Sequence, residues 1–251
     1  MQIFDDLEAE LTRLDEILGS LDRAAWTAPS AAAGWSVADV VLHLAQTDET
    51  VVETAAAGRL GIIRPLRGDE GTLTVDEAMD AWVRAERTEP ELVHARWRAA
   101  ATAAVQALRA ADPAVPLTWV AAPLRPAVLA TTRLAEHWAH ALDITEPLAI
   151  PLPDTDRLRH VAWLAHRTLP YAFAVGGDEG ERAPALRVEL TAPDGATVWE
   201  YGPPAAEAVI SGPAGAFCRV GARRLAPADA GLTTSGPAAD RALALLRNYA
   251  A

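Results

Sequence analysis

Residues 133–143 of the chain read RLAEHWAHALD, with five charged or polar side chains set among alanine, leucine and tryptophan. Each residue of an ideal helix turns the chain by about 100°, so residues four apart lie one above the other on the same face. Glu136 and His140 have this spacing, whereas His137 falls on the flank. One helix can therefore offer a carboxylate and an imidazole to one metal ion, as helical bundles commonly do. The stretch predicts a helical bundle with a polar site inside it.

Two more polar residues share the strip of this carboxylate–imidazole pair, which is about 80° wide on a helical wheel. Asp143 lies one turn beyond His140. It can orient that imidazole as a hydrogen-bond acceptor around the metal, or pair with Arg133 instead. The spacing leaves both alternatives open. Leu134 and Trp138 are buried as well only if the helix is covered nearly all round.

A further ligand has to come from another helix, and His43 is the natural candidate. It lies in VADVVLHLAQTDE, residues 37–49, among apolar residues that repeat with the period of a buried helix face. A lone histidine in such a place is more often a core residue, so the combination with the downstream pair carries the argument. Gln46, Thr47 and Asp48 follow by about a turn, and the spacing does not choose which of them faces the site.

Apolar residues at three- and four-residue steps predict four long helices in the first two thirds of the chain. They are expected near residues 3–21, 37–57, 74–111 and 126–145, with a loop at 59–73. Ser36 caps the second helix, with Asp39 three residues on as an imperfect capping box. The third either breaks or begins again at Glu89–Pro90, because proline disfavours helix in the residue before it. These elements predict an antiparallel four-helix bundle.

The pattern changes in the last third. Another helix is expected at about 155–169. Leu186, Val188 and Leu190 then alternate, a Pro193-Asp194-Gly195 turn follows, and a strand at 198–201 completes a hairpin. Short strands are expected in EAVISGP and GLTTSGP, and helices over 213–225 and 237–249. We therefore expect a metal-binding helical bundle over 1–165 and a small α+β domain over 166–251.

Composition narrows the class of protein. The 251 residues carry a net charge of −12 and are 51% hydrophobic, which supplies a packed core and argues against a general nucleic-acid binder. Cys218 is the single cysteine, so an internal disulfide is impossible and a reducing cytoplasm is the expected location. The N-terminus has acidic residues where a signal peptide would be basic, and a membrane partner is not expected.

The segments GWSVADVVLHL and RLAEHWAHALD together resemble the DinB-like superfamily of four-helix metalloproteins. The closer resemblance is to its mycothiol-dependent maleylpyruvate isomerase-like branch, and it extends over nearly the whole chain. RLRHVAWLAHRTLPYAFAVGG and VELTAPDG are similar to a subgroup described only as metal-binding. The resemblance implies a bundle followed by a small α+β domain of sterol-carrier-like fold. It also implies that His43, Glu136 and His140 are the metal ligands and that His137 is not one.

Two imidazoles and one carboxylate suit zinc, with a fourth position open, although nickel, iron(II) or manganese can occupy the same set. In the resembled branch the thiol cosubstrate is mycothiol. We therefore expect a zinc-dependent, thiol-using transferase or isomerase that acts on a small electrophilic metabolite. The alternatives are a metal-dependent hydrolase or lyase that uses metal-bound water, and a non-catalytic metal- or ligand-binding protein. A homodimer through the bundle helices is compatible with the pattern.

The remaining candidates lie in the C-terminal domain. Arg219, Arg223 and Arg224 in FCRVGARRL offer forks that suit a carboxylate of the thiol or the substrate, although a basic last turn of a helix explains them as well. Cys218 is expected to be a small buried residue rather than a nucleophile. The thiol of the reaction would then have to come from outside the chain.

Overall fold

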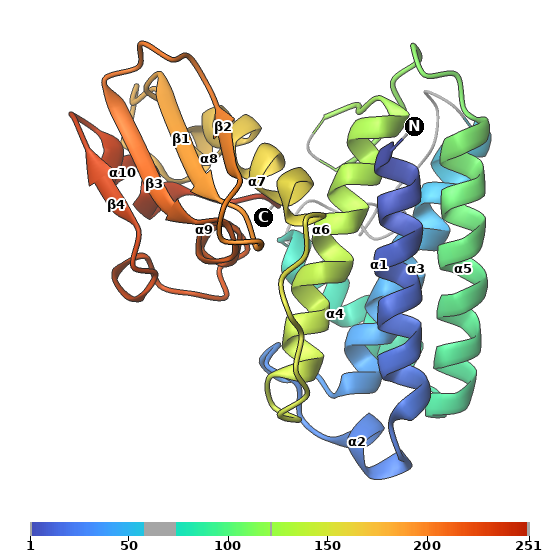
Figure 1. Ribbon diagram of the computed structural model, residues 1–251. Helices are drawn as coiled ribbons and strands as arrows, with labels where there is room; N and C mark the ends of the chain where they lie inside the picture. Colours follow the sequence, from blue (N-terminus) through green and yellow to red (C-terminus); the bar gives the residue numbers. More distant parts are fainter. Residues whose placement is uncertain (1, 58–73, 121, 250–251) are drawn as a thin grey trace. The chain divides into compact units, whose positions relative to one another are not determined.

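The computed structural model describes residues 2–57, 74–120 and 122–249 (Figure 1). The chain divides into two compact units, one that extends to Leu152 and one from Pro153 to Tyr249. The loop predicted at 59–73 lies outside the described residues.

Four long helices lie side by side in the first unit (Figure 1). They are α1 (Gln2–Ser20), α3 (Val37–Ala57), α5 (Pro90–Ala110) and α6 (Pro126–Thr145), with the shorter α2 (Arg23–Thr27) and α4 (Val75–Ala85) in the connections between them. α3 packs against α5 and α6, and α1 packs against the same two helices. The predicted four-helix bundle is confirmed.

The helix starts follow from local chemistry. Ser36 Oγ accepts from the backbone N–H of Asp39, and the Asp39 carboxylate accepts from the N–H of Ser36, so the predicted capping box is present. α4 ends at Ala85 and α5 begins at Pro90, which confirms the predicted break. Pro126 opens α6, where its missing N–H leaves no helical hydrogen bond unmade.

Solvent reaches little of α6 on any side, since sixteen of its twenty residues are buried. Leu134 and Trp138 lie on its apolar side, with exposures of 1% and 2%. Arg133, His137 and Asp143 on its polar side are just as buried. The helix can therefore present a polar strip to the interior of the bundle and still bury its large apolar side chains.

The second unit contains a four-stranded sheet in the order β2-β1-β3-β4. Its elements are α7 (Leu158–Arg167), α8 (Leu169–Gly176), β1 (Leu186–Thr191), β2 (Val198–Tyr201), β3 (Ala208–Pro213), α9 (Ala214–Gly221), the 3-10 turn Pro227–Asp229, β4 (Thr233–Ser235) and α10 (Ala239–Leu245). β1 pairs antiparallel with β2 through the predicted turn, in which Gly195 has a φ of +73°. β1 pairs in parallel with β3. The predicted α+β character is confirmed.

Several boundaries differ from those expected from the sequence. The second unit begins before the predicted boundary at 165, because α7 packs against α9. A side chain at Gly221 would meet Ala165 Cβ at 3.2 Å, so glycine permits this close approach. The helix expected over 213–225 ends at Gly221, and Arg223 beyond it has a φ of +59°. The last helix covers 239–245 rather than 237–249.

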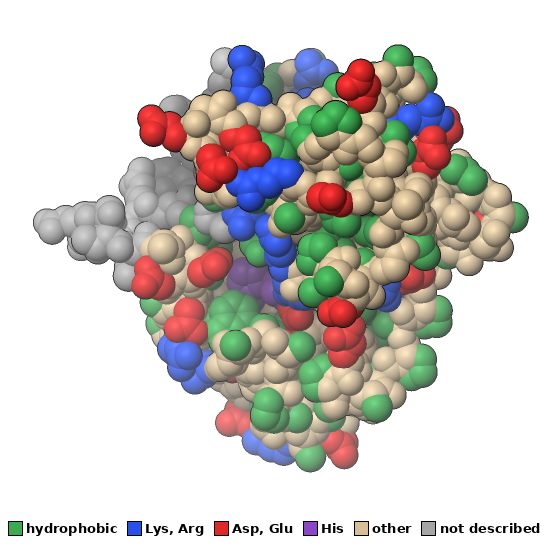
Figure 2. Space-filling view, turned by 90° about the vertical axis from the view of Figure 1, so that its left-hand side faces the viewer, with side chains coloured by type: hydrophobic (Ala, Val, Ile, Leu, Met, Phe, Trp, Pro, Cys, Tyr) green, Lys and Arg blue, Asp and Glu red, His purple; other side chains and the backbone are tan. Residues whose placement is uncertain are grey.

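Acidic and basic side chains are interspersed over the face shown in Figure 2. On that face the net negative charge is therefore spread out rather than gathered into one patch. Within the described ranges, every helix is too short or too polar to cross a bilayer.

Candidate metal centre

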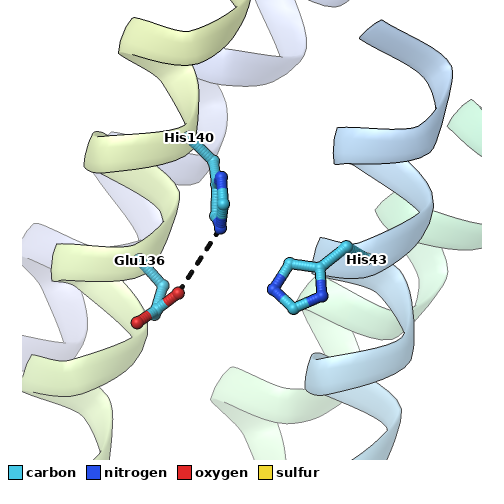
Figure 3. Close-up of side chains that lie close together, drawn as sticks. All are labelled: His43, Glu136 and His140. Atoms are coloured by element: carbon cyan, nitrogen blue, oxygen red, sulfur yellow. Dashed lines mark ion pairs between the residues drawn. The ribbon is translucent and has the colours of Figure 1, made fainter. Parts of the chain in front are cut away.

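Three side chains from two helices converge inside the bundle. Figure 3 shows Glu136 and His140 on α6 pointing toward His43 on α3. One donor atom from each lies within 4.8 Å of the others, and among the described residues this is the set of three with the geometry of a metal site. His140 Nε2 lies 3.6 Å from Glu136 Oε2, and the rings of His43 and His140 are 5.0 Å apart between centroids. The predicted helix geometry, with Glu136 and His140 stacked one turn apart, is therefore observed.

The cluster is buried, with its carboxylate the most accessible part. His43 and His140 are each 9% exposed, whereas the Glu136 side chain is 28% exposed. Trp35 covers the other side of His43, with ring centroids 5.2 Å apart. Glu136 is therefore the member of the cluster most open to solvent.

Burial and neighbouring charges set the protonation of the three groups. Burial lowers the pKa of His43 to about 3, helped by the positive charge of His140. Burial opposes ionisation of Glu136, but the hydrogen bond and charge of His140 outweigh it and lower the Glu136 pKa to about 2. Burial also opposes protonation of His140, yet Asp143 and Glu136 raise its pKa. At neutral pH, His43 is a neutral imidazole and Glu136 is a carboxylate, which are the forms that bind metals.

Asp143 orients the His140 ring. Its Oδ2 atom lies 2.8 Å from His140 Nδ1, and its side chain is 3% exposed. The carboxylate accepts a hydrogen bond from Nδ1, which leaves Nε2 as the ring nitrogen that faces Glu136 and His43. The first of the two sequence alternatives for Asp143 is the observed one.

Arg133 pairs with α3 and not with Asp143. Its Nε donates to Asp48 Oδ1 at 3.0 Å, and its Nη2 donates to Thr47 Oγ1 at 2.8 Å. Gln46 points elsewhere and donates to Glu86 at 3.1 Å. Of the three residues that follow His43, Thr47 and Asp48 therefore face α6, one turn away from the cluster. The sequence offered Asp48 as a candidate but gave no sign of its partner.

His137 stays outside the cluster, as predicted. Trp97 Nε1 donates to His137 Nε2 at 3.2 Å, and His137 Nδ1 lies 2.8 Å from the carbonyl oxygen of Arg133. His137 Nε2 also lies 3.1 Å from Asp48 Oδ2. Its Nε2 atom faces α3 and α5 and its Nδ1 atom faces a carbonyl oxygen of α6, so the contacts of both ring nitrogens lead away from Glu136 and His140.

The C-terminal candidates have partners within the second unit. Arg219 forms two hydrogen bonds with Asp154, at 2.9 and 3.0 Å, and Arg223 donates to the carbonyl oxygens of residues 244 and 245. Their role in binding a carboxylate stays a prediction. Cys218 is fully buried, and burial raises the pKa of its thiol, so its assignment as a buried residue is confirmed.

The fold and the site together define a class of proteins. Its members have a four-helix bundle, with two imidazoles and a carboxylate on facing helices as a buried set of possible metal ligands, and a small α+β unit after the bundle. Residues 7–145 match the family model described as the mycothiol maleylpyruvate isomerase N-terminal domain. The chain belongs to this family, as the resemblance of its two motifs implied.

Known proteins resemble the chain over nearly its full length. Proteins of two Mycobacterium tuberculosis strains, described as uncharacterized, are 32% identical over 247 residues, which cover 98% of this chain and 94% of the relatives. Crystal structures of mycothiol-dependent maleylpyruvate isomerase and of a histidine-to-alanine variant share the fold, each with a TM-score of 0.62. They are 16% and 15% identical to this chain, and each match covers 93% of this chain and 92% of the other.

Proposed function

We propose that this protein is a zinc-dependent enzyme that acts on a small electrophilic metabolite with the help of a small-molecule thiol. The thiol either promotes isomerisation of the metabolite or is transferred onto it. The observation that carries the proposal is the convergence of His43, Glu136 and His140, whose donor atoms lie within 4.8 Å of one another. Membership of a family named for a mycothiol-dependent isomerase supports the thiol part of the proposal. We assign mycothiol as the thiol to be tested first.

The donor set fits a zinc ion with one position open to a ligand. Two imidazoles and one carboxylate are a common set for zinc sites that bind a further group, and nickel, iron(II) and manganese remain chemically compatible with it. When bound, such an ion supplies Lewis-acid chemistry and lowers the pKa of a thiol in the open position.

The chain's own residues prepare this set for an ion. Asp143 accepts a hydrogen bond from His140 Nδ1, so Nε2 is the nitrogen left to coordinate once it has lost its own proton. Glu136 is ionised and His43 is neutral, so neither has to lose a proton before binding. The greater exposure of Glu136 leaves a route for a thiol from solution.

A thiolate can isomerise an activated double bond without being consumed. Its sulfur forms a bond to one alkene carbon, and the π electron pair moves onto the conjugated carbonyl group. The former double bond, now single, rotates. The electron pair then returns, the carbon–sulfur bond breaks, and the thiolate leaves with its electrons. Cys218 is buried and its thiol pKa is raised, so we assign the sulfur to an external thiol.

Metal binding by the purified protein tests the ligand assignment. The wild-type chain is expected to bind one zinc ion, and His43→Ala, Glu136→Ala and His140→Ala are each expected to lose it. His94→Ala is the matched control, since His94 is a bundle histidine that pairs with Asp15 instead of the cluster. Zinc bound equally well by wild type and all three cluster variants would contradict the assignment.

Thiol reactivity tests the enzymatic role. The zinc-loaded protein is expected to accelerate the reaction of mycothiol with maleylpyruvate or with a chromogenic electrophile, and Glu136→Ala is expected to abolish the gain. Zinc-loaded protein that leaves thiol reactions unchanged but hydrolyses ester or amide probes would favour the metal-bound-water alternative. Loaded protein that does neither would favour a binding role.

A further inference from the structure

Two pairs of residues on α6, each four residues apart, face α3. Glu136 and His140 face His43, as described above. Arg133 and His137 form the other pair, three residues nearer the helix start, and both approach Asp48. Residues at this spacing project from the same side of a helix, so the second pair forms a grip of its own.

The grip on Asp48 is buried and directional. The side chains of Arg133, His137 and Asp48 are exposed by 3%, 1% and 2%. Arg133 donates from Nε to Asp48 and from Nη2 to Thr47, so its planar fork contacts two successive residues of α3. Thr47 Oγ1 in turn donates to the carbonyl oxygen of His43 at 2.9 Å. The grip thus connects the backbone of one proposed ligand to the helix that carries the other two.

The grip lies about one helical turn from the metal cluster on both helices. Arg133 precedes Glu136 by three residues, or about 4.5 Å along the helix axis, and Thr47 follows His43 by four residues, or about 6 Å. Zinc–nitrogen bonds are about 2.0–2.1 Å long and tolerate deviations of about 0.2 Å. A slide of α3 along α6 by one residue, about 1.5 Å, would therefore break the set.

Apolar burial by itself does not select one axial position of α3 along α6, because hydrophobic burial is non-directional. Val40 and Leu44, which flank His43 in the sequence of α3, are aliphatic and fully buried. Hydrogen bonds depend on direction as well as distance, so the bonds of Arg133 define one register of the two helices.

We propose that Arg133, with Asp48 as its partner on α3, is the positioning residue of the metal centre: it fixes the register of α3 on α6 that brings His43 to Glu136 and His140. The inference rests on the proposed metal centre. His137, which is not one of the three cluster residues, lies 3.1 Å from the same carboxylate.

Electrostatics and positioning predict opposite signs for one substitution. Arg133→Met keeps a long side chain and removes a positive charge near the proposed ion. If Arg133 acted only through its charge, zinc would bind more tightly in the variant, because the repulsion is gone and Asp48 is left unpaired. If Arg133 fixes the register, zinc is expected to bind about 10- to 100-fold more weakly, as for losses of groups that orient metal ligands.

A double variant separates positioning from overall stability. Arg133→Met alone strands a buried carboxylate and is expected to lower the melting temperature, whereas Arg133→Met/Asp48→Leu replaces the pair by apolar groups and is expected to restore much of it. Zinc affinity is expected to stay about 10- to 100-fold weakened in the double variant. Arg133→Lys, whose ammonium can bond to Asp48 but not reproduce the fork, is expected to lie between Arg133→Met and wild type.

The control is an ion pair between α3 and α5, a helix that carries none of the three proposed ligands. Arg96 on α5 forms two hydrogen bonds of 2.7 Å with Glu49, the neighbour of Asp48. Arg96→Met is therefore expected to leave zinc affinity unchanged, whatever it does to the melting temperature.

Zinc affinity is measured by competition with a chromophoric chelator, and the geometry of the site by the d–d absorption of the Co²⁺-loaded proteins. A changed Co²⁺ spectrum together with weaker zinc binding in the double variant is the expected result. Zinc affinity that equals or exceeds the wild-type value in Arg133→Met, or that recovers with the melting temperature in the double variant, overturns the positioning role and leaves the metal centre intact. A wild-type chain that binds no zinc overturns both.

Discussion

Replacement of Asp143 is expected to weaken zinc binding, moderately when asparagine takes its place and more strongly when alanine does. Asp143 Oδ2 lies 2.8 Å from His140 Nδ1, and the carboxylate is 3% exposed, so solvent screens the interaction little. Hydrogen bonds to charged groups contribute about 1.5–3 kcal/mol and neutral ones about 0.5–1.5 kcal/mol. Asp143→Asn keeps an acceptor and loses the charge, so we expect a loss of about 1–1.5 kcal/mol, or a 5- to 12-fold weaker zinc affinity. Asp143→Ala removes the bond and is expected to weaken zinc binding by about 10- to 150-fold.

The assay for this series is chelator competition at neutral pH, with circular dichroism to establish that each variant is folded. Glu146→Gln is the control, because Glu146 is an exposed acidic residue at the end of the same helix. The order wild type, Asn, Ala is the essential result. An Asp143→Ala variant that is folded and binds zinc as tightly as wild type would refute the reasoning, since the carboxylate would then not orient His140.

Four further predictions concern pH and reactivity. Zinc affinity is expected to fall as the pH is lowered through the raised pKa of His140, while His43, with a pKa of about 3, stays neutral; a chelator titration from about pH 8 to pH 5 measures this. Without metal, the stability that protonated His140 contributes is fully present below its unfolded pKa and is lost as the pH rises through the raised value, which urea unfolding reports. Asp39→Asn is expected to lower the free energy of unfolding by about 1–3 kcal/mol at neutral pH, because burial opposes ionisation of Asp39 but its bonds to Arg87 lower its pKa. This difference from wild type is present above the pKa of Asp39 in the unfolded chain and is lost as the pH falls through the lowered pKa of the folded protein. Urea unfolding at a neutral and an acidic pH measures it. Cys218 is expected to react with an aromatic disulfide reagent only after denaturation, because the thiol is fully buried and its pKa is raised.

The sequence was sufficient for the features that depend on one helix at a time. Helix periodicity placed Glu136 under His140 and moved His137 to the flank, and a proline located the break before α5. Helix geometry alone also excludes an ion pair between Arg133 and Asp143. Arg133 and Asp143 are ten residues apart, which corresponds to about 15 Å along the axis and is beyond the reach of an arginine side chain.

Contacts between helices do not follow from the sequence pattern of either helix alone. The partner of Asp48 depends on how α3 is placed along α6, and the apolar pattern of each helix defines its buried face but not its axial position. The same holds for Trp97, whose indole N–H reaches His137 from α5. α8 escaped prediction for a different reason: Pro170 follows its first residue and reads as a helix end, although proline is tolerated in a first turn.

The amount of charge on α6 is itself an argument for a site. Burial of ions is costly, and buried ion pairs are often replaceable by apolar residues with no loss of stability. A helix selected only for packing would therefore not need Arg133, Glu136 and Asp143 on its inner face. Two of these charges bond to the proposed ligands or to residues next to them: Asp143 to His140, and Arg133 to the turn that follows His43. Their arrangement is accounted for by the need to hold Glu136, His140 and His43 at fixed positions around one point, which a stable bundle alone does not require.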